Sequence, residues 1–183
     1  MQRNATPLDG LFVISTEQHT DERGAFSRLF CRAALSDILV DKTIVQINQS
    51  ITTKRGALRG LHFQNSPAEE TKLVRCLRGE VFDVAVDLRP KSPTFLQWYG
   101  QILSAQNAKM MLIPDGFAHG FQALQDNVEL LYLHTEFYQP CFEGGIHYQD
   151  PKLNITWPLA IAEVSQKDQL LPNITPEFQG ISL

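Results

Sequence analysis

One histidine stands in a segment whose residue types suit acid–base chemistry. His62 lies in the segment Arg59–Gln64, and a second histidine, His119, follows later in the chain. An imidazole changes its protonation state near neutral pH, so a positioned histidine can remove or return a proton during a reaction. A single histidine in a β-protein is more often a surface residue or a satisfied core residue. Cationic Arg59 and Lys72 lie close to His62 in sequence, so a base and an anion clamp could share one pocket.

The alternative to acid–base chemistry is a metal site. Pro114-x-Gly116-x-x-His119 is similar to the second motif of the cupins, and metal-binding cupins usually add an earlier His-x-His and a Glu. Here the earlier stretch is His62-Phe63-Gln64, with one histidine where two are needed. A catalytic metal needs about three protein ligands. The sequence therefore predicts no metal site, and we expect no cofactor.

Basic residues are concentrated in one region of a chain whose net charge is −4. They are Lys54, Arg55, Arg59, Lys72, Arg75 and Arg78. Such a cluster is either a solvated basic strand or a pocket for a compact anion such as a diphosphate, which arginine can bind through two oxygens. Composition alone favours the solvated strand.

Three further side chains have both a structural and a chemical interpretation. Asp83 has apolar neighbours on both sides, so its carboxylate needs a partner such as a histidine or lysine if it is buried. Ser165-x-x-Asp168 is typical of a helix-capping box. Tyr132 shares a strand face with Val128 and Leu130, and core packing is its simpler explanation.

Short alternating segments separated by turn residues dominate the chain and must position these side chains. In Val81–Leu88 the even-numbered residues form one apolar face. Similar strands are expected at 44–48, 72–76, 95–103, 110–113 and 128–134, with turns at 21–24, 78–79 and 114–116. Helices are expected at Ala33–Leu39 and from Ser165. Many strands with few helices predict a mainly β sandwich or barrel, and residues 1–183 are expected to form one domain.

Composition excludes several classes of protein. The acidic balance argues against a general nucleic-acid or anionic-membrane partner. No apolar run approaches the roughly 18 residues of a membrane span, and the N-terminus lacks the apolar core of a signal peptide. Three cysteines without metal-ligand spacing are expected to be reduced, packed thiols of a cytoplasmic protein.

Taken in order, several segments resemble the dTDP-4-dehydrorhamnose 3,5-epimerase family, from about Leu11 to Asp168. The segments are Asp21–Phe26, Gln46–Ser50, Gly56–Gln64, Lys72–Arg75, Phe82–Arg89, Ser92–Phe95, Gly116–Phe121, the pair Tyr132 and Tyr138, Trp157-Pro158 and Ser165–Asp168. The resemblance implies a metal-independent cupin jelly roll (a double-stranded β-helix) with a few short peripheral helices, assembled as a homodimer. It also implies a role in deoxysugar and polysaccharide biosynthesis.

The resemblance also implies roles for individual residues. The catalytic set is His62 as the base, Asp168 as its orienting carboxylate, Tyr132 as the acid on the other face of the sugar, and Lys72 as the cation beside the enolate oxygen. The implied substrate-binding residues are Arg23, Phe26, Arg28, Gln46, Asn48, Arg59, His119, Tyr138, Glu143 and Lys167. The N-terminal strand with Arg23 is expected to reach the partner subunit's site. The implied reaction is epimerisation at C3, at C5 or at both carbons of a nucleoside-diphosphate 4-keto-6-deoxy sugar, with dTDP-4-dehydro-6-deoxyglucose as the leading substrate.

Two departures from the family pattern and three rival functions accompany this prediction. Arg28 stands where the family commonly has a glutamate that contacts the nucleotide, so a nucleotide other than dTDP is an alternative. Phe63 replaces a frequent tyrosine. The rivals are a sugar-nucleotide 3,4-ketoisomerase, a non-catalytic sugar-nucleotide-binding cupin and, last, a metal-dependent cupin oxygenase.

Overall fold

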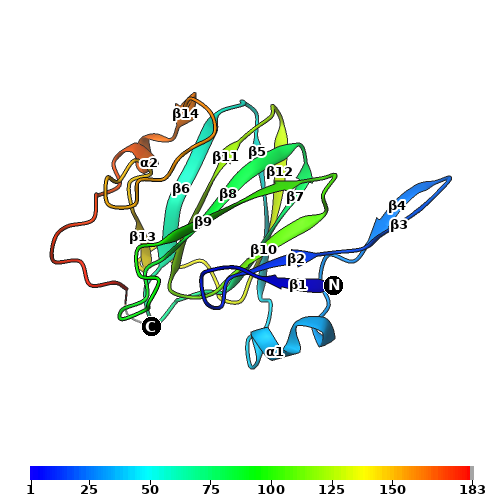
Figure 1. Ribbon diagram of the computed structural model, residues 1–183, viewed down its shortest axis with the longest axis horizontal. Coiled ribbons are helices and arrows are strands. Elements are labelled where there is room, and N and C mark those ends of the chain that lie inside the picture. The colour runs from blue at the N-terminus through cyan, green and yellow to red at the C-terminus, as the bar shows by residue number, and fades with distance from the viewer. Residues whose placement is uncertain (182–183) are drawn as a thin grey trace.

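Two predominantly antiparallel β-sheets face each other in the computed structural model, which describes residues 1–181 (Figure 1). The first sheet has the order β1 (Gln2–Ala5), β2 (Phe12–Ser15), β10 (Lys109–Ile113), β7 (Lys72–Arg78), β12 (Val128–His134) and β5 (Gln46–Thr52). The second has the order β13 (Glu143–Gly145), β6 (Ala57–Gln64), β11 (Phe117–Ala123), β8 (Glu80–Asp87) and β9 (Trp98–Ser104), with β14 (Glu163–Val164) parallel to β6.

The chain crosses repeatedly from one sheet to the other. From β5 to β8 each strand lies in the sheet opposite to its predecessor, and β10, β11 and β12 alternate in the same way. This alternation closes the two sheets into a jelly roll. The mainly β, cupin-type fold expected from the sequence is therefore confirmed.

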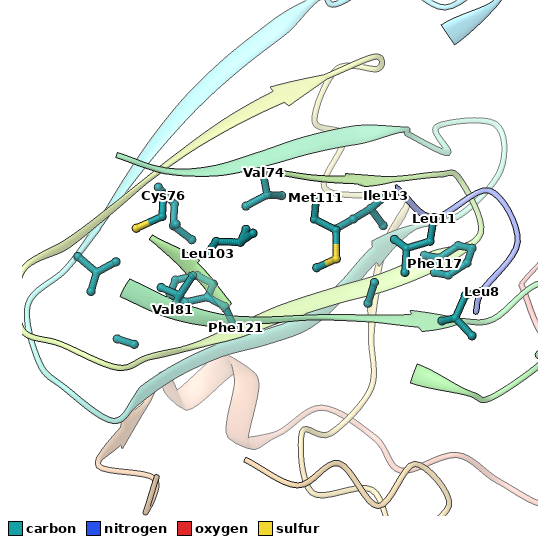
Figure 2. Packing of buried hydrophobic residues seen from close by; sticks show 14 residues of the cluster. Leu8, Leu11, Val74, Cys76, Val81, Leu103, Met111, Ile113, Phe117 and Phe121 are labelled. Atoms are coloured by element: carbon teal, nitrogen blue, oxygen red, sulfur yellow. The ribbon is translucent and has the colours of Figure 1, made fainter. Parts of the chain in front are cut away.

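Strand β8 has two buried faces, as its alternation predicts. Val81 and Ala85 belong to the core between the sheets, where Figure 2 shows Val81 close to Phe121. Val84 and Val86 point the other way, into a second apolar cluster that the C-terminal segment helps to cover. Because both faces exclude water, the polar side chains on this strand need partners within the protein.

The outer face of the first sheet is covered by a short helical segment. A 3₁₀ turn, η1 (Ala33–Leu35), runs into α1 (Ser36–Leu39), which confirms the helix expected there. Leu35 and Leu39 are fully buried against side chains of the sheet, among them Met110. No helix within residues 1–181 is long and apolar enough to cross a membrane.

Two peripheral elements carry predicted site residues. The hairpin of β3 (Gln18–Asp21) and β4 (Gly24–Ser27) extends away from both sheets, with the predicted turn between its strands (Figure 1). Helix α2 (Gln166–Gln169) lies beside β6, and the Ser165 side chain accepts a hydrogen bond from the Asp168 amide. The N-cap hydrogen bond of the predicted capping box is therefore present, while the Asp168 carboxylate bonds Gly60 and His62.

Candidate active site

A cavity of about 600 Å³ lies between the two sheets, a volume typical of small-molecule sites. Strands β5, β7 and β12 provide one wall, and β6 with the α2 segment provides the opposite wall. Nine of the residues proposed from sequence line it: Asn48, Arg59, His62, Lys72, Tyr132, Tyr138, Glu143, Lys167 and Asp168. The structure therefore brings all four implied catalytic residues together.

His62 and Asp168 form a hydrogen-bonded pair on the β6 wall. His62 Nε2 lies 2.7 Å from Asp168 Oδ1, and Asp168 Oδ2 accepts the Gly60 N–H at 3.1 Å. Burial alone would raise the pKa of Asp168, but the hydrogen bonds from His62 and Gly60 outweigh burial and lower it. An ionised carboxylate only accepts hydrogen bonds, so Nε2 must carry the proton. Nδ1 of a neutral His62 is then the basic atom of the ring.

Close packing of β6 against β11 fixes the backbone beside this pair. Gly60 has φ +116°, in the region that favours glycine, and a Cβ there would lie 2.6 Å from Gly120 Cα. The ladder between the two strands also shifts register between His119 and Phe121, directly opposite this point. A side chain at Gly60 would push the strands apart and displace the amide that holds Asp168.

Lys72 lies on the opposite wall and is joined to two residues that the sequence analysis did not single out. Lys72 Nζ is 2.6 Å from Glu70 Oε1, and His134 Nδ1 bonds the other oxygen of Glu70. His134 is also the direct neighbour of Lys72 across the β7–β12 ladder. Burial would raise the pKa of Glu70, but the Lys72 charge and the His134 hydrogen bond lower it to about 2. For His134 the available signal was alternation from Tyr132, because residues two apart share a strand face.

Tyr132 is held between two imidazole rings. Its ring meets His119 edge-on at 6.2 Å and lies nearly parallel to His134 at 6.0 Å, measured between centroids. The phenol oxygen is 3.1 Å from Ser50 Oγ, another residue that the sequence analysis missed. Burial raises the pKa of Tyr132 well above its usual value. The phenol therefore stays protonated at neutral pH and can donate.

His119 lies behind Tyr132 rather than among the residues that line the cavity. Its Nε2 is 2.8 Å from Oδ1 of Asp83, whose side chain is fully buried. The partner expected for a buried Asp83 is therefore His119. The buried position of His119 suits a supporting contact beneath Tyr132 more directly than a contact with diphosphate.

Charged and polar side chains also surround the outer part of the cavity. Glu143 Oε2 accepts hydrogen bonds from Tyr138 Oη at 2.7 Å and from Lys167 Nζ at 2.6 Å. Burial would raise the pKa of Glu143, but these bonds lower it. Arg59 donates to Thr52 Oγ1 and to the Ile51 carbonyl oxygen. These contacts anchor Arg59 at the cavity wall.

The basic cluster of the sequence is divided between two sides of the sheet. Lys54, Arg59 and Lys72 line the cavity. Arg75, three residues after Lys72, points to the other face of β7 and donates to Thr16 Oγ1 and the Ala108 carbonyl oxygen. The alternative interpretation of the cluster as one anion pocket therefore fits Lys54, Arg59 and Lys72 but not Arg55, Arg75 or Arg78. Lys72 and Arg75 are an odd number of residues apart on β7, so they face opposite sides of the sheet.

Four other proposed substrate ligands lie away from the cavity lining. Arg23, Phe26 and Arg28 are exposed on or just after the hairpin, where Arg23 pairs with Asp21. Gln46 accepts a hydrogen bond from the Tyr138 amide at 3.2 Å, so it contacts the backbone of a cavity residue. Within residues 1–181, no group of three His, Cys, Asp or Glu side chains is placed to hold a metal ion.

Comparison with known proteins identifies the family. The family model for dTDP-4-dehydrorhamnose 3,5-epimerase matches residues 5–175. An enzyme of that name from Methanothermobacter thermautotrophicus is 46% identical over 90% of this chain and 89% of its own. A dTDP-4-dehydrorhamnose 3-epimerase from Streptomyces niveus is 37% identical over 88% of this chain and 78% of its own.

A solved structure extends the likeness to the fold. The crystal structure of a dTDP-6-deoxy-D-glucose-3,5-epimerase from Legionella pneumophila, in complex with dTDP-4-keto-L-rhamnose, superimposes with a TM-score of 0.92. The two sequences are 41% identical, and the match covers 100% of this chain and 98% of the other. This chain belongs to the dTDP-4-dehydrorhamnose 3,5-epimerase family of isomerases.

Proposed function

We propose that this protein epimerises dTDP-4-dehydro-6-deoxyglucose at C3 and C5 to give dTDP-4-dehydrorhamnose. The observation that carries the proposal is the placement of His62 on one sheet, paired with Asp168 from helix α2, facing Tyr132 and Lys72 on the other sheet. Inversion of a carbon needs a base and an acid on opposite faces of the sugar ring, and two facing sheets supply this geometry.

The C4 ketone of the substrate acidifies the protons on C3 and C5. His62 Nδ1 removes one of them, and Asp168 stabilises the imidazolium that forms. The electron pair moves to the ketone oxygen, where Lys72 stabilises the negative charge of the enolate. Tyr132 then donates a proton to the same carbon from the opposite face. His62 has gained a proton and Tyr132 has lost one, so both must be reset before the next inversion.

The nucleotide end of the substrate would bind at the outer part of the cavity. We assign the diphosphate to Arg59 and Lys167, with His119 supporting the site from behind Tyr132. Stacking of the base is assigned to Tyr138, with Asn48 and Glu143 as polar contacts. Tyr138 is half exposed and hydrogen-bonded to Glu143, so its ring is accessible yet fixed in orientation.

We infer that the active form is a homodimer in which the β3–β4 hairpin reaches the partner subunit. The hairpin extends from the body and exposes 73% of Phe26. Ile47 and Ile51 on edge strand β5 are also exposed, at 62% and 54%. Apolar groups gathered at an edge strand are typical of an interface. Arg23, Phe26 and Arg28 would then contact a nucleotide bound in the partner's cavity, beside its Gln46.

We expect the reaction to take place in the cytoplasm. Cys31, Cys76 and Cys141 are free thiols, which fits a reducing compartment. The expectation that all three thiols are packed holds for Cys76, which is buried, but is wrong for Cys141, which is exposed.

Incubation with dTDP-4-keto-6-deoxyglucose in deuterated water tests the proposed function. We expect deuterium at both C3 and C5 and a product whose NMR spectrum is that of the 4-keto-rhamnose sugar. Deuterium at C3 alone would make the protein a 3-epimerase, and a carbonyl moved to C3 would make it a ketoisomerase.

Two controls complete this experiment. His62→Ala should abolish exchange while dTDP still binds, since the base is gone and the nucleotide contacts remain. The CDP and GDP forms of the substrate test the nucleotide, because Arg28 reverses a charge that the family usually has there. Tight dTDP binding without any exchange in the wild type would overturn the enzymatic proposal in favour of a binding protein.

A further inference from the structure

Glu70 connects Lys72 to His134 within the cavity wall, and nothing in the proposed mechanism yet uses Glu70 or His134. The side chains of Lys72, Glu70 and His134 are only 8%, 10% and 11% exposed. An ammonium that is removed from water is costly unless a counter-charge and hydrogen bonds hold it. Glu70 supplies that counter-charge at 2.6 Å from Lys72 Nζ.

The ionised state of Glu70 fixes the hydrogen-bond directions in this group. Its pKa is lowered to about 2, where the Lys72 charge and the His134 hydrogen bond outweigh burial. An ionised carboxylate accepts only, so Lys72 donates to Oε1 and His134 donates its Nδ1 proton to Oε2. Nε2 of His134 then faces the Asn48 amide at 3.4 Å. Each oxygen of Glu70 is thus held by a different donor, and the carboxylate cannot turn without losing one of them.

We propose that Glu70 and His134 are positioning residues of the epimerase reaction: His134 fixes the Glu70 carboxylate, and Glu70 holds the Lys72 ammonium charged at the cavity wall beside the developing enolate. The inference rests on the proposed function. Lys72 and His134 are cross-strand neighbours on β7 and β12, so the rigid ladder sets the spacing of the group. The ring of His134 also lies nearly parallel to that of Tyr132. His134 therefore contacts both Glu70, which holds Lys72, and Tyr132, the proposed proton donor.

Loss of the counter-charge should change the pH dependence of the reaction in a defined direction. A buried ammonium without its carboxylate gives up its proton more readily. Neutral lysine cannot stabilise an oxyanion, so Glu70→Gln should move the alkaline limb of the kcat profile to lower pH. The other titratable groups that line the same cavity are Tyr132 and His134 on β12, Arg59 and His62 on β6, and Lys54, Tyr138, Glu143, Glu163, Lys167 and Asp168 around it, while β5 contributes uncharged Asn48 and Ser50. Tyr132 does not account for this limb, because burial raises its pKa.

Substitutions at His134 separate positioning from proton transfer. An asparagine places its amide N–H close to where histidine has Nδ1, so His134→Asn can keep the bond to Glu70, whereas His134→Ala cannot. We expect Glu70→Gln and His134→Ala to lower kcat by about 10- to 100-fold, a fraction of the usual effect of an electrostatic stabiliser. The KM for the sugar nucleotide and the affinity for dTDP should change little. His134→Asn should retain most of kcat.

The experiment measures kcat, KM, the pH profile and dTDP binding for the three variants beside wild type. Glu177→Gln in the exposed C-terminal segment and His147→Asn, whose ring stacks on Tyr148 outside the cavity, are the matched controls. Wild-type kcat in Glu70→Gln, or equal losses in His134→Asn and His134→Ala, would overturn the positioning role. Loss of dTDP binding together with activity would assign the group to folding instead. A wild type that is itself inactive would overturn the proposed function and this inference with it.

Discussion

His62 and His119 are directly opposite each other on β6 and β11, yet each is paired with a different carboxylate. His62 bonds Asp168 from α2 at 2.7 Å, and His119 bonds Asp83 from β8 at 2.8 Å. The His62 side chain is 34% exposed and faces the cavity, while that of His119 is 7% exposed. The His62–Asp168 pair is therefore accessible from the cavity, whereas the His119–Asp83 pair is buried behind the cavity wall.

Replacement of Asp168 by asparagine should prevent His62 from acting as the base while the cavity keeps its shape. Asparagine can donate toward His62 Nε2 and so favours the wrong tautomer, with the proton on Nδ1. We expect kcat to fall by about 100- to 10,000-fold, the range typical of positioned proton transfer. Deuterium exchange from solvent measures this loss, and dTDP binding should persist. Exchange at the wild-type rate would contradict the assignment of Nδ1 as the base.

Removal of the Tyr132 hydroxyl should separate proton removal from inversion. In Tyr132→Phe the ring can remain between His119 and His134, but the donor near Ser50 is lost. His62 can still remove a proton and return a solvent-derived one to the same face. We therefore expect deuterium in recovered substrate while formation of the epimer falls by at least about 100-fold.

The control for this prediction is Tyr148→Phe, which alters a tyrosine that stacks on His147. That variant should form product at the wild-type rate. Equal loss of exchange and inversion in Tyr132→Phe would show that the phenol acts before or during proton removal.

Asp83 should matter more for stability than for chemistry. Its side chain is fully buried, and asparagine would take away the carboxylate that bonds His119 Nε2. Leaving a buried hydrogen-bonding group without its partner typically costs about 1–3 kcal/mol. We expect Asp83→Asn to lower the free energy of unfolding in urea by that amount. The exposed Asp41→Asn is the control and should stay within about 0.5 kcal/mol of wild type.

Asp87 should contribute to unfolding at acid pH. It lies at the end of β8 and accepts hydrogen bonds from Arg89, Ser92 and Thr94. Burial would raise the pKa of Asp87, but these bonds lower it to about 2 from 3.8. A lowered folded-state pKa gives stability that is present above pH 3.8 and is lost as pH falls through about 2. The contribution is about 2 kcal/mol. Asp87→Asn should therefore flatten the pH dependence of unfolding between pH 4 and 2, and an unchanged slope would contradict this account.

Alternation and turn spacing were enough to predict a mainly β sandwich or barrel, whereas the jelly roll and most of the cavity residues were predicted from the resemblance to the family. The two faces of Val81–Leu88 and the N-cap hydrogen bond at Ser165 follow from local sequence and are present in the structure. Alternation also explains why Lys72 and Arg75 lie on opposite faces of β7, although their charge alone suggested one cluster. Glu70 could not be placed in this way. It precedes β7, and burial of a carboxylate there depends on Lys72 and on His134 from a strand distant in sequence.

The proposed exchange of hairpins between subunits predicts complementation between two inactive variants. His62→Ala removes the base from the body, and Arg23→Ala combined with Phe26→Ala removes the hairpin's contacts. If the hairpin serves the partner's cavity, a mixed dimer has one site with both defects and one site with neither. If the hairpin served its own subunit, each site of the mixed dimer would carry one defect.

Mixing the two variants by unfolding and refolding them together, at equal concentration, tests this arrangement. Random pairing makes half of the dimers mixed, and each has one intact site, so about a quarter of the wild-type activity should return. Each variant refolded alone gives the background rate, and the molar mass in solution reports whether dimers form. Activity that stays at background in a dimeric mixture would place the hairpin with its own subunit, and a monomer would exclude the exchange. A quarter of the activity is the specific signature of sites shared between subunits, because defects that lie in the same site cannot be restored by pairing.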